Sequence, residues 1–128
     1  MSALEISDKD LLIGARKGIS KSMLISIAHE CELTLKELST YLKISIRTIQ
    51  KKNQSQLIAP DPSEKALYIA KLFKLGIESF GSQGKFHNWL NTENTVMGGE
   101  KPASYLDTFS GILLVMDELN AIKYGFSA

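Results

Sequence analysis

Residues 34–53 read TLKELSTYLKISIRTIQKKN, which is the pattern of two short amphipathic helices separated by a break. Thr34 and Glu37 have the spacing of a capping box, in which the threonine oxygen and the glutamate each accept an amide hydrogen bond. The break covers residues 43–45, and Ser45 is the expected N-cap of the second helix. This order of elements predicts a helix-turn-helix unit. The apolar side chains expected to face inward in this unit are Leu35, Leu38, Leu42, Ile44, Ile46 and Ile49.

The second helix of this unit carries polar side chains on its predicted outer face. Arg47 can bind a guanine edge through two hydrogen bonds, Gln50 can bind adenine, and Thr48 can reach a base or a phosphate. Lys51 and Lys52 suit phosphate contacts. We therefore predict that these five residues bind operator DNA. From spacing alone, the solvated face of an ordinary helical hairpin explains the same residues equally well, and that alternative stays open.

Two positions differ from the usual residues of such a unit. Ser39 occupies the middle of the first helix, where alanine is common, and serine is small enough to fit. Lys43 occupies the turn, where glycine is common. A left-handed conformation at Lys43 would cost about 1–2 kcal/mol, which a packed domain can absorb.

The charge of the chain is distributed unevenly although its net charge is only +1 at pH 7. Residues 1–60 contain nine Lys and Arg against six Asp and Glu, whereas residues 61–128 contain six against eight. Glu37 is the only acidic residue between Lys36 and Lys52, where five basic residues lie. A local basic cluster can attract phosphates, but charge alone is weak evidence because solvated lysine faces are common.

Helical periodicity also recurs on both sides of this unit, and strand-like alternation is scarce. Upstream, Ser20 is the expected N-cap of a helix. The predicted buried face of that helix consists of Leu24, Ile27, Ala28 and Cys31. Downstream, Asp61 as N-cap and Pro62 as the first helical residue predict the start of a long helix. Its predicted inward side chains are Ala66, Ile69, Ala70, Phe73, Ile77 and Phe80.

The C-terminal part is predicted to consist of shorter helices between glycine-containing turns. Pro102 restarts a helix, and Asp107 and Thr108 are the expected caps of the last helix. That last helix is apolar throughout residues 112–116, which is more than one buried face needs and indicates a second partner surface. The predicted fold class is all-α. We place an N-terminal helix-turn-helix lobe over residues 1–60 and a small helical lobe over residues 61–128.

Several classes of protein are disfavoured by composition and spacing. The chain has no apolar run long enough for a membrane span and no signal-peptide pattern at its start. Its single cysteine excludes an internal disulfide. We therefore expect a cytoplasmic protein. His29, His87 and Cys31 lack a metal-ligand spacing, and Asp117 and Glu118 are adjacent and so diverge on a helix. We expect no enzyme, no metal site and no cofactor.

A resemblance to a known family comes from the C-terminal third. Its residues follow the order aromatic, Trp-Leu, Asn, Gly-Gly, Pro, Leu-x-Thr, Gly and a closing Tyr-Gly. The stretches that match are residues 86–94 (FHNWLNTEN), 97–102 (MGGEKP), 106–108 (LDT), Gly111 and 122–125 (IKYG). This pattern resembles the toxin-binding domain of Xre/MbcA/ParS-type antitoxins. Residues 15–19 and 45–52 resemble the DNA-binding half of the same family.

The resemblance implies a type II toxin–antitoxin system. Such antitoxins silence a cognate toxin and often repress their own promoter, and their halves commonly support homodimer formation. Their toxins often have an ADP-ribosyltransferase-like fold and consume NAD. By this analogy the residues expected to contact the toxin are Trp89, Lys123, Tyr124, Gly125 and Phe126. Trp89 is large and amphipathic and could anchor an interface, but a core position that pins the helices together is the better-supported role.

Two other functions remain open from the residues alone. The first alternative is a stand-alone helix-turn-helix transcriptional regulator whose C-terminal lobe serves only for dimerisation. Operator binding without any protein partner would favour it. A helical adaptor with no DNA role ranks third, and it predicts that the protein has no salt-dependent affinity for DNA.

Overall fold

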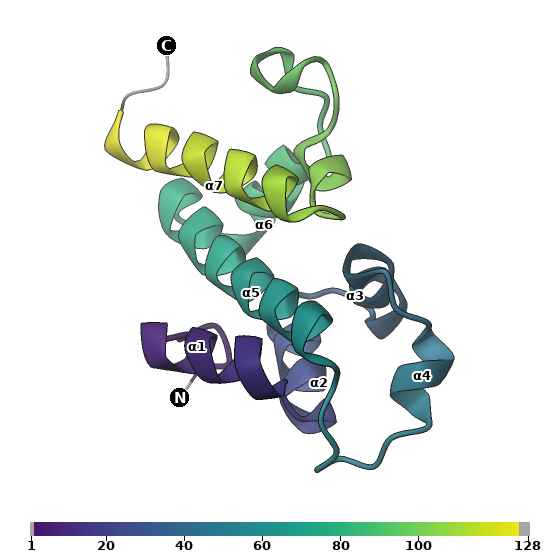
Figure 1. Ribbon diagram of the computed structural model, residues 1–128. Coiled ribbons are helices and arrows are strands. Elements are labelled where there is room, and N and C mark those ends of the chain that lie inside the picture. The colour runs from purple at the N-terminus through teal and green to yellow at the C-terminus, as the bar shows by residue number, and fades with distance from the viewer. Residues whose placement is uncertain (1, 126–128) are drawn as a thin grey trace. The chain divides into compact units, whose positions relative to one another are not determined.

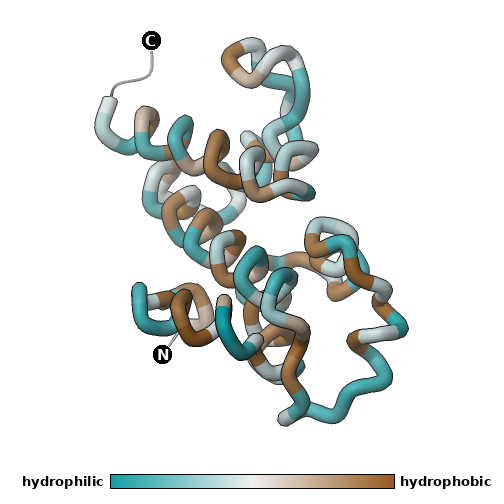
Figure 2. The backbone as a smooth tube through the Cα atoms, in the orientation of Figure 1, coloured by the Kyte–Doolittle hydropathy of each residue, from teal (hydrophilic) through white to brown (hydrophobic). Residues whose placement is uncertain are grey.

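The computed structural model describes residues 2–125, and its regular elements there are helices without any strand (Figure 1). The predicted all-α fold class is confirmed. The elements are α1 (Asp8–Lys17), α2 (Lys21–Glu30), α3 (Leu35–Leu42), α4 (Ile46–Gln50), α5 (Pro60–Phe80), α6 (Gln83–Leu90), the short 3-10 helices η1 (Thr95–Met97) and η2 (Pro102–Tyr105), and α7 (Phe109–Tyr124). Hydrophobic and hydrophilic positions alternate along these helices, as amphipathic packing requires (Figure 2).

The first four helices each begin after a serine or threonine whose side chain accepts a hydrogen bond from an amide that has no partner within the helix. Ser7, Ser20, Thr34 and Ser45 all accept a hydrogen bond from a backbone N–H of the first helical turn. Glu37 completes the predicted capping box by accepting the amide of Thr34 at 3.0 Å. These side chains explain why the N-terminal part divides into helices at these points. The predicted caps at Ser20, Thr34 and Ser45 are confirmed.

The chain forms two compact units, Met1–Lys71 and Leu72–Ala128, which divide within α5. We predicted the boundary after residue 60, eleven residues earlier. The first half of α5 belongs to the N-terminal unit because its polar side chains bind there. Ser63 bonds to the amide of Ile19, and Lys65 donates to the carbonyl of Tyr41 at 3.1 Å.

The predicted start of α5 needs a correction. The helix begins at Pro60, so Asp61 lies inside its first turn and is not the N-cap. Pro60 and Pro62 both fit the first turn, because amides at that point have no partner within the helix and proline presets the backbone angle φ.

Most of the side chains predicted to face inward on α2, α3 and α4 are buried in the core of the N-terminal unit. The buried hydrophobic side chains of α2 with its C-cap, of α3 and of α4 are Leu24, Ile27, Ala28, Cys31, Leu38, Leu42 and Ile49. Leu35, Ile44 and Ile46 are only half-buried, which corrects their predicted inward position. They lie at helix ends and in the turn, where one side of the residue faces solvent.

The C-terminal unit is built around the second half of α5 together with α6 and α7. Its fully buried side chains include Phe73, Phe86, Leu106, Ile112 and Leu119. A Cβ atom at Gly76 would lie 2.2 Å from the ring of Phe86, so α5 and α6 approach each other too closely for any side chain there. Ile77 and Phe80, predicted to face inward, are half-buried.

Among the described residues, no helix is both long enough and apolar enough to cross a membrane.

Candidate functional site

The turn between α3 and α4 sets the direction of the second helix of the helix-turn-helix unit (Figure 1). Lys43 takes the left-handed conformation, with φ 55° and ψ 39°, and the next amide, that of Ile44, donates to the carbonyl of Ser39 at 3.1 Å. The turn is therefore left-handed, with lysine at the position where glycine is common. Ser39 is buried and its hydroxyl donates to the carbonyl of Lys36 at 2.7 Å, so its polar atom has a partner.

α4 is anchored on one side and open to solvent on the other. Ile49 is fully buried, and the hydroxyl of Ser45 accepts the amide of Arg47 at 3.1 Å. The predicted DNA-binding side chains Arg47, Thr48, Gln50 and Lys51 are exposed, whereas Lys52 is half-buried. The structure thus brings four of the five onto one short, accessible helix and its C-terminal cap.

The surface around α4 is basic. Lys36, Lys43, Arg47 and Lys51 are exposed. The single acidic residue of this segment, Glu37, has its carboxylate engaged at the start of α3 as part of the capping box. The segment therefore presents an excess of positive charge to solvent, which is what binding a phosphate backbone requires.

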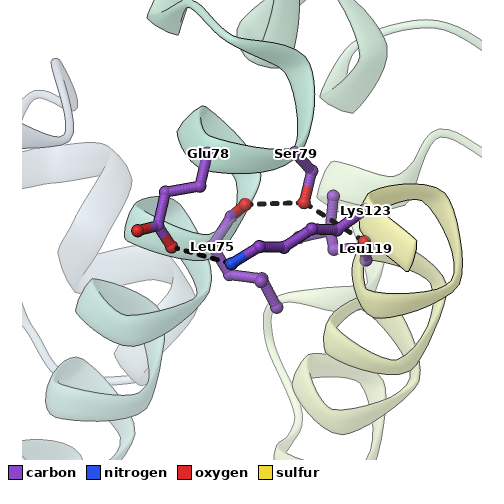
Figure 3. Close-up of polar contacts among 5 residues, drawn as sticks. All are labelled: Leu75, Glu78, Ser79, Leu119 and Lys123. Atoms are coloured by element: carbon purple, nitrogen blue, oxygen red, sulfur yellow. Dashed lines mark hydrogen bonds and ion pairs between the residues drawn. The ribbon is translucent and has the colours of Figure 1, made fainter.

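A second candidate surface lies at the C-terminal end of α7. Lys123 forms an ion pair with Glu78 of α5 at 3.5 Å, and its ammonium lies 5.6 Å from the centroid of the Tyr124 ring. Close by, the hydroxyl of Ser79 is hydrogen-bonded to the carbonyls of Leu75 at 2.7 Å and Leu119 at 3.1 Å (Figure 3). These contacts join the ends of α5 and α7.

The residues expected to meet the toxin occupy different environments. Tyr124 is 60% exposed, and Gly125 ends α7 with a positive φ of 74°. Phe126, the last predicted contact, lies outside the described residues. Trp89 is half-buried, with its ring centroid 5.5 Å from that of Phe80 and 6.3 Å from that of Phe86. These contacts support a packing role for Trp89, and they leave part of its surface accessible.

The apolar excess of α7 also appears in the structure. Ile112, Val115 and Leu119 are buried, while Leu113 and Leu114 are about half exposed, at 48% and 55%. α7 therefore carries one buried face and a second apolar patch in solvent. The sequence interpretation of a further partner surface has a structural counterpart in Leu113 and Leu114.

Comparison with known proteins finds a family match in each part of the chain. Residues 10–71 match the antitoxin Xre-like helix-turn-helix domain. Residues 75–125 match the antitoxin Xre/MbcA/ParS C-terminal toxin-binding domain. The chain belongs to the Xre/MbcA/ParS-type antitoxins. The resemblance inferred from the sequence is thereby confirmed, and the first match ends where the first compact unit ends, at Lys71. A search of curated proteins finds no match.

The single cysteine of the antitoxin and its potential metal ligands bear on whether the chain carries chemistry of its own. Cys31 is buried at the end of α2, and burial raises the pKa of its thiol, so the reactive thiolate is suppressed. Within residues 2–125, no group of three or more His, Cys, Asp and Glu side chains could hold a metal ion.

Sequence reasoning missed Lys21 of the antitoxin. This residue is the first of α2, and its ammonium donates to the carbonyls of Gln50 at 3.3 Å and Lys52 at 2.8 Å. No sequence signal marked it, because the two carbonyls are about thirty residues away and carry no side-chain signature.

Proposed function

We propose that the antitoxin neutralises its toxin through the C-terminal end of α7, with Lys123, Tyr124, Gly125 and Phe126 as contacts. The exposure of Tyr124 at the end of α7 carries this proposal, because a rigid amphipathic ring in solvent is a typical anchor of a protein interface. Trp89, which is half-buried, is proposed as a further contact with the toxin. By the family resemblance, the toxin is an NAD-consuming enzyme with an ADP-ribosyltransferase-like fold.

We further propose that the antitoxin represses its own promoter through α4. Arg47 and Gln50 would bind base edges, Thr48 a base or phosphate, and Lys51 and Lys52 phosphates. The exposure of Arg47 and Gln50 and the basic surface around them support this assignment. Because α4 has only five residues, a single unit would contact few base pairs.

A homodimer would supply a second helix-turn-helix unit for a two-fold symmetric operator. Two exposed apolar pairs support dimerisation: Leu12 and Ile13 on α1, and Leu113 and Leu114 on α7. The single cysteine, Cys31, is compatible with work in the reducing cytoplasm. Light scattering on the purified antitoxin measures the oligomeric state directly.

Expression of the neighbouring open reading frame, with and without the antitoxin, tests the toxin proposal. Growth should stop when the neighbour is expressed alone and should resume with the antitoxin present, and the two proteins should elute together. A harmless neighbour that does not co-purify would contradict toxin neutralisation. In that case, operator binding by the antitoxin alone would favour the stand-alone regulator instead.

A further inference from the structure

We propose that Lys21 is a positioning residue for operator binding: it fixes the C-terminal end of α4 and makes no contact with a DNA phosphate itself. The proposal rests on the proposed role of α4 in reading DNA. Its structural part, the clamp on α4, can be tested without DNA.

The contacts of Lys21 are to backbone oxygens at one end of α4. Its ammonium donates to the carbonyl of Gln50, the last residue of α4, and to that of Lys52 just beyond. The last carbonyls of a helix have no partner within the helix, and a cation there also interacts favourably with the helix dipole. Lys21 is half-buried, so this lysine is placed as a cap and not as an extended arm in solvent.

α4 depends on such a cap because it is short. Five residues make little more than one turn, and helices of that length are not stable on their own. At its N-terminal end the helix is held by Ser45, whose hydroxyl accepts the amide of Arg47. On its inner face it is held by the buried side chain of Ile49. At its C-terminal end, Lys21 is the side chain that reaches its carbonyl groups from α2.

Backbone hydrogen bonds at Lys21 and Ser22 also attach the start of α2 to the loop after α4. The amide of Lys21 donates to the carbonyl of Gln56 at 2.9 Å, and the amide of Ser22 donates to that of Gln54 at 3.0 Å. These amides belong to the first turn of α2, where helical amides lack internal partners. The first turn of α2 therefore holds both the end of α4 and the loop after it.

This attachment should matter for specific binding more than for general attraction to DNA. Hydrogen bonds to base edges require Arg47 and Gln50 to be held at a fixed place, whereas attraction to phosphates depends mainly on charge. A looser α4 would therefore lose affinity for the operator and keep its affinity for other sequences. A direct phosphate contact by Lys21 would instead contribute to both.

The test compares the wild-type antitoxin with Lys21→Met, which keeps most of the side-chain stem and removes the donor. Amide hydrogen exchange without DNA reports on residues 48–58. Binding to the promoter DNA upstream of its own gene, and to a shuffled duplex, is measured over a series of salt concentrations. Lys9→Met is the matched control, because Lys9 is an exposed lysine of α1 and its loss removes the same charge.

We expect amide exchange over residues 48–58 to be faster in Lys21→Met and unchanged in Lys9→Met. The operator affinity of Lys21→Met should be about 3- to 10-fold weaker than that of Lys9→Met, and the two variants should have equal salt slopes, because neither loses a phosphate contact. Lys21→Gln, which keeps an N–H donor without the charge, should recover part of the operator affinity. Unchanged exchange, or a salt slope that falls by about one unit below that of the control, would overturn the proposal. Faster exchange with unchanged operator affinity would overturn it as well.

Two further results separate this proposal from the proposed function. If the wild-type antitoxin does not bind the promoter, the repressor function fails and hydrogen exchange alone decides the clamp. If Lys21→Met does not fold, the same measurements on Lys21→Gln decide, because that variant keeps a donor of reduced reach and should show a smaller change in the same direction.

Discussion

The hydroxyl of Ser63 accepts a hydrogen bond from the backbone amide of Ile19 at 2.9 Å and donates one to the carbonyl of Ile58 at 3.0 Å. The side chain is fully buried, and both of its hydrogen-bonding roles are used. One hydroxyl thus joins the start of α5 to the segment between α1 and α2. It also holds the chain that returns from the helix-turn-helix unit.

Replacing Ser63 with alanine should lower the free energy of unfolding by about 1–3 kcal/mol, because the buried amide of Ile19 would lose its partner. Urea denaturation followed by circular dichroism measures the change. Ser104→Ala is the control, since Ser104 is exposed and its hydroxyl bonds only locally to the carbonyl of Lys101. Equal stabilities of the two variants would argue against a stabilising role of the hydrogen bonds that Ser63 forms with Ile19 and Ile58.

Gly76→Ala should destabilise the C-terminal unit by about 1–3 kcal/mol, since the added methyl group would overlap the ring of Phe86. Gly84→Ala in α6 is a matched control, because a Cβ atom there meets nothing within 4 Å. That variant should be neutral or gain up to about 1 kcal/mol from the better helix propensity of alanine. Thermal unfolding distinguishes the two, and similar shifts in both would contradict the close approach of α5 and α6.

Lys43→Gly should stabilise the antitoxin by about 1 kcal/mol, because glycine takes the left-handed conformation without the Cβ penalty. Lys43→Ala removes the same charge and keeps the penalty, so it should show no such gain. Denaturant titration of both variants isolates the backbone effect. If alanine stabilised as much as glycine, charge and not conformation would be the cause.

Arg47→Ala should weaken binding to the antitoxin's own promoter DNA by about 1–3 kcal/mol and relax base preference at one position of the operator. Lys51→Ala should weaken binding to all sequences and reduce the salt slope by about one unit. Fluorescence anisotropy over a salt series measures both quantities. An unchanged operator affinity in Arg47→Ala would refute α4 as the helix that reads DNA.

Tyr124→Ala should weaken toxin binding by about 2 kcal/mol, as expected when an aromatic anchor is truncated, and should leave the melting temperature unchanged because Tyr124 is exposed. Asn120→Ala, also exposed on α7, serves as the control for helix effects. Calorimetric titration with the purified toxin measures the difference. Loss of binding in both variants would place the interface along α7 and not at its end.

Much of the local structure was predictable from short patterns. The caps at Ser20, Thr34 and Ser45 and the buried stripe of α2 follow from spacings of three and four residues, which lie on one face of a helix. The left-handed conformation of Lys43 was weighed only as a condition, because glycine is common at that position and the sequence has lysine there.

The start of α5 is a position that sequence reasoning misplaced. α5 begins at Pro60 and not after Asp61, because two prolines in the first turn both suit a helix start. The two compact units divide within α5, whose periodicity shows no break at Lys71.

By itself, the sequence predicted an all-α chain with a helix-turn-helix unit and a resemblance to Xre/MbcA/ParS-type antitoxins, since periodicity, caps and family pattern are local properties that neighbouring residues carry. Only the tertiary structure decided that Lys21 holds the end of α4, that Ser63 binds Ile19, and that Lys123 pairs with Glu78. Each of these contacts joins residues about thirty or more positions apart. The acceptor or partner depends on where the chain folds back, and no local pattern records that.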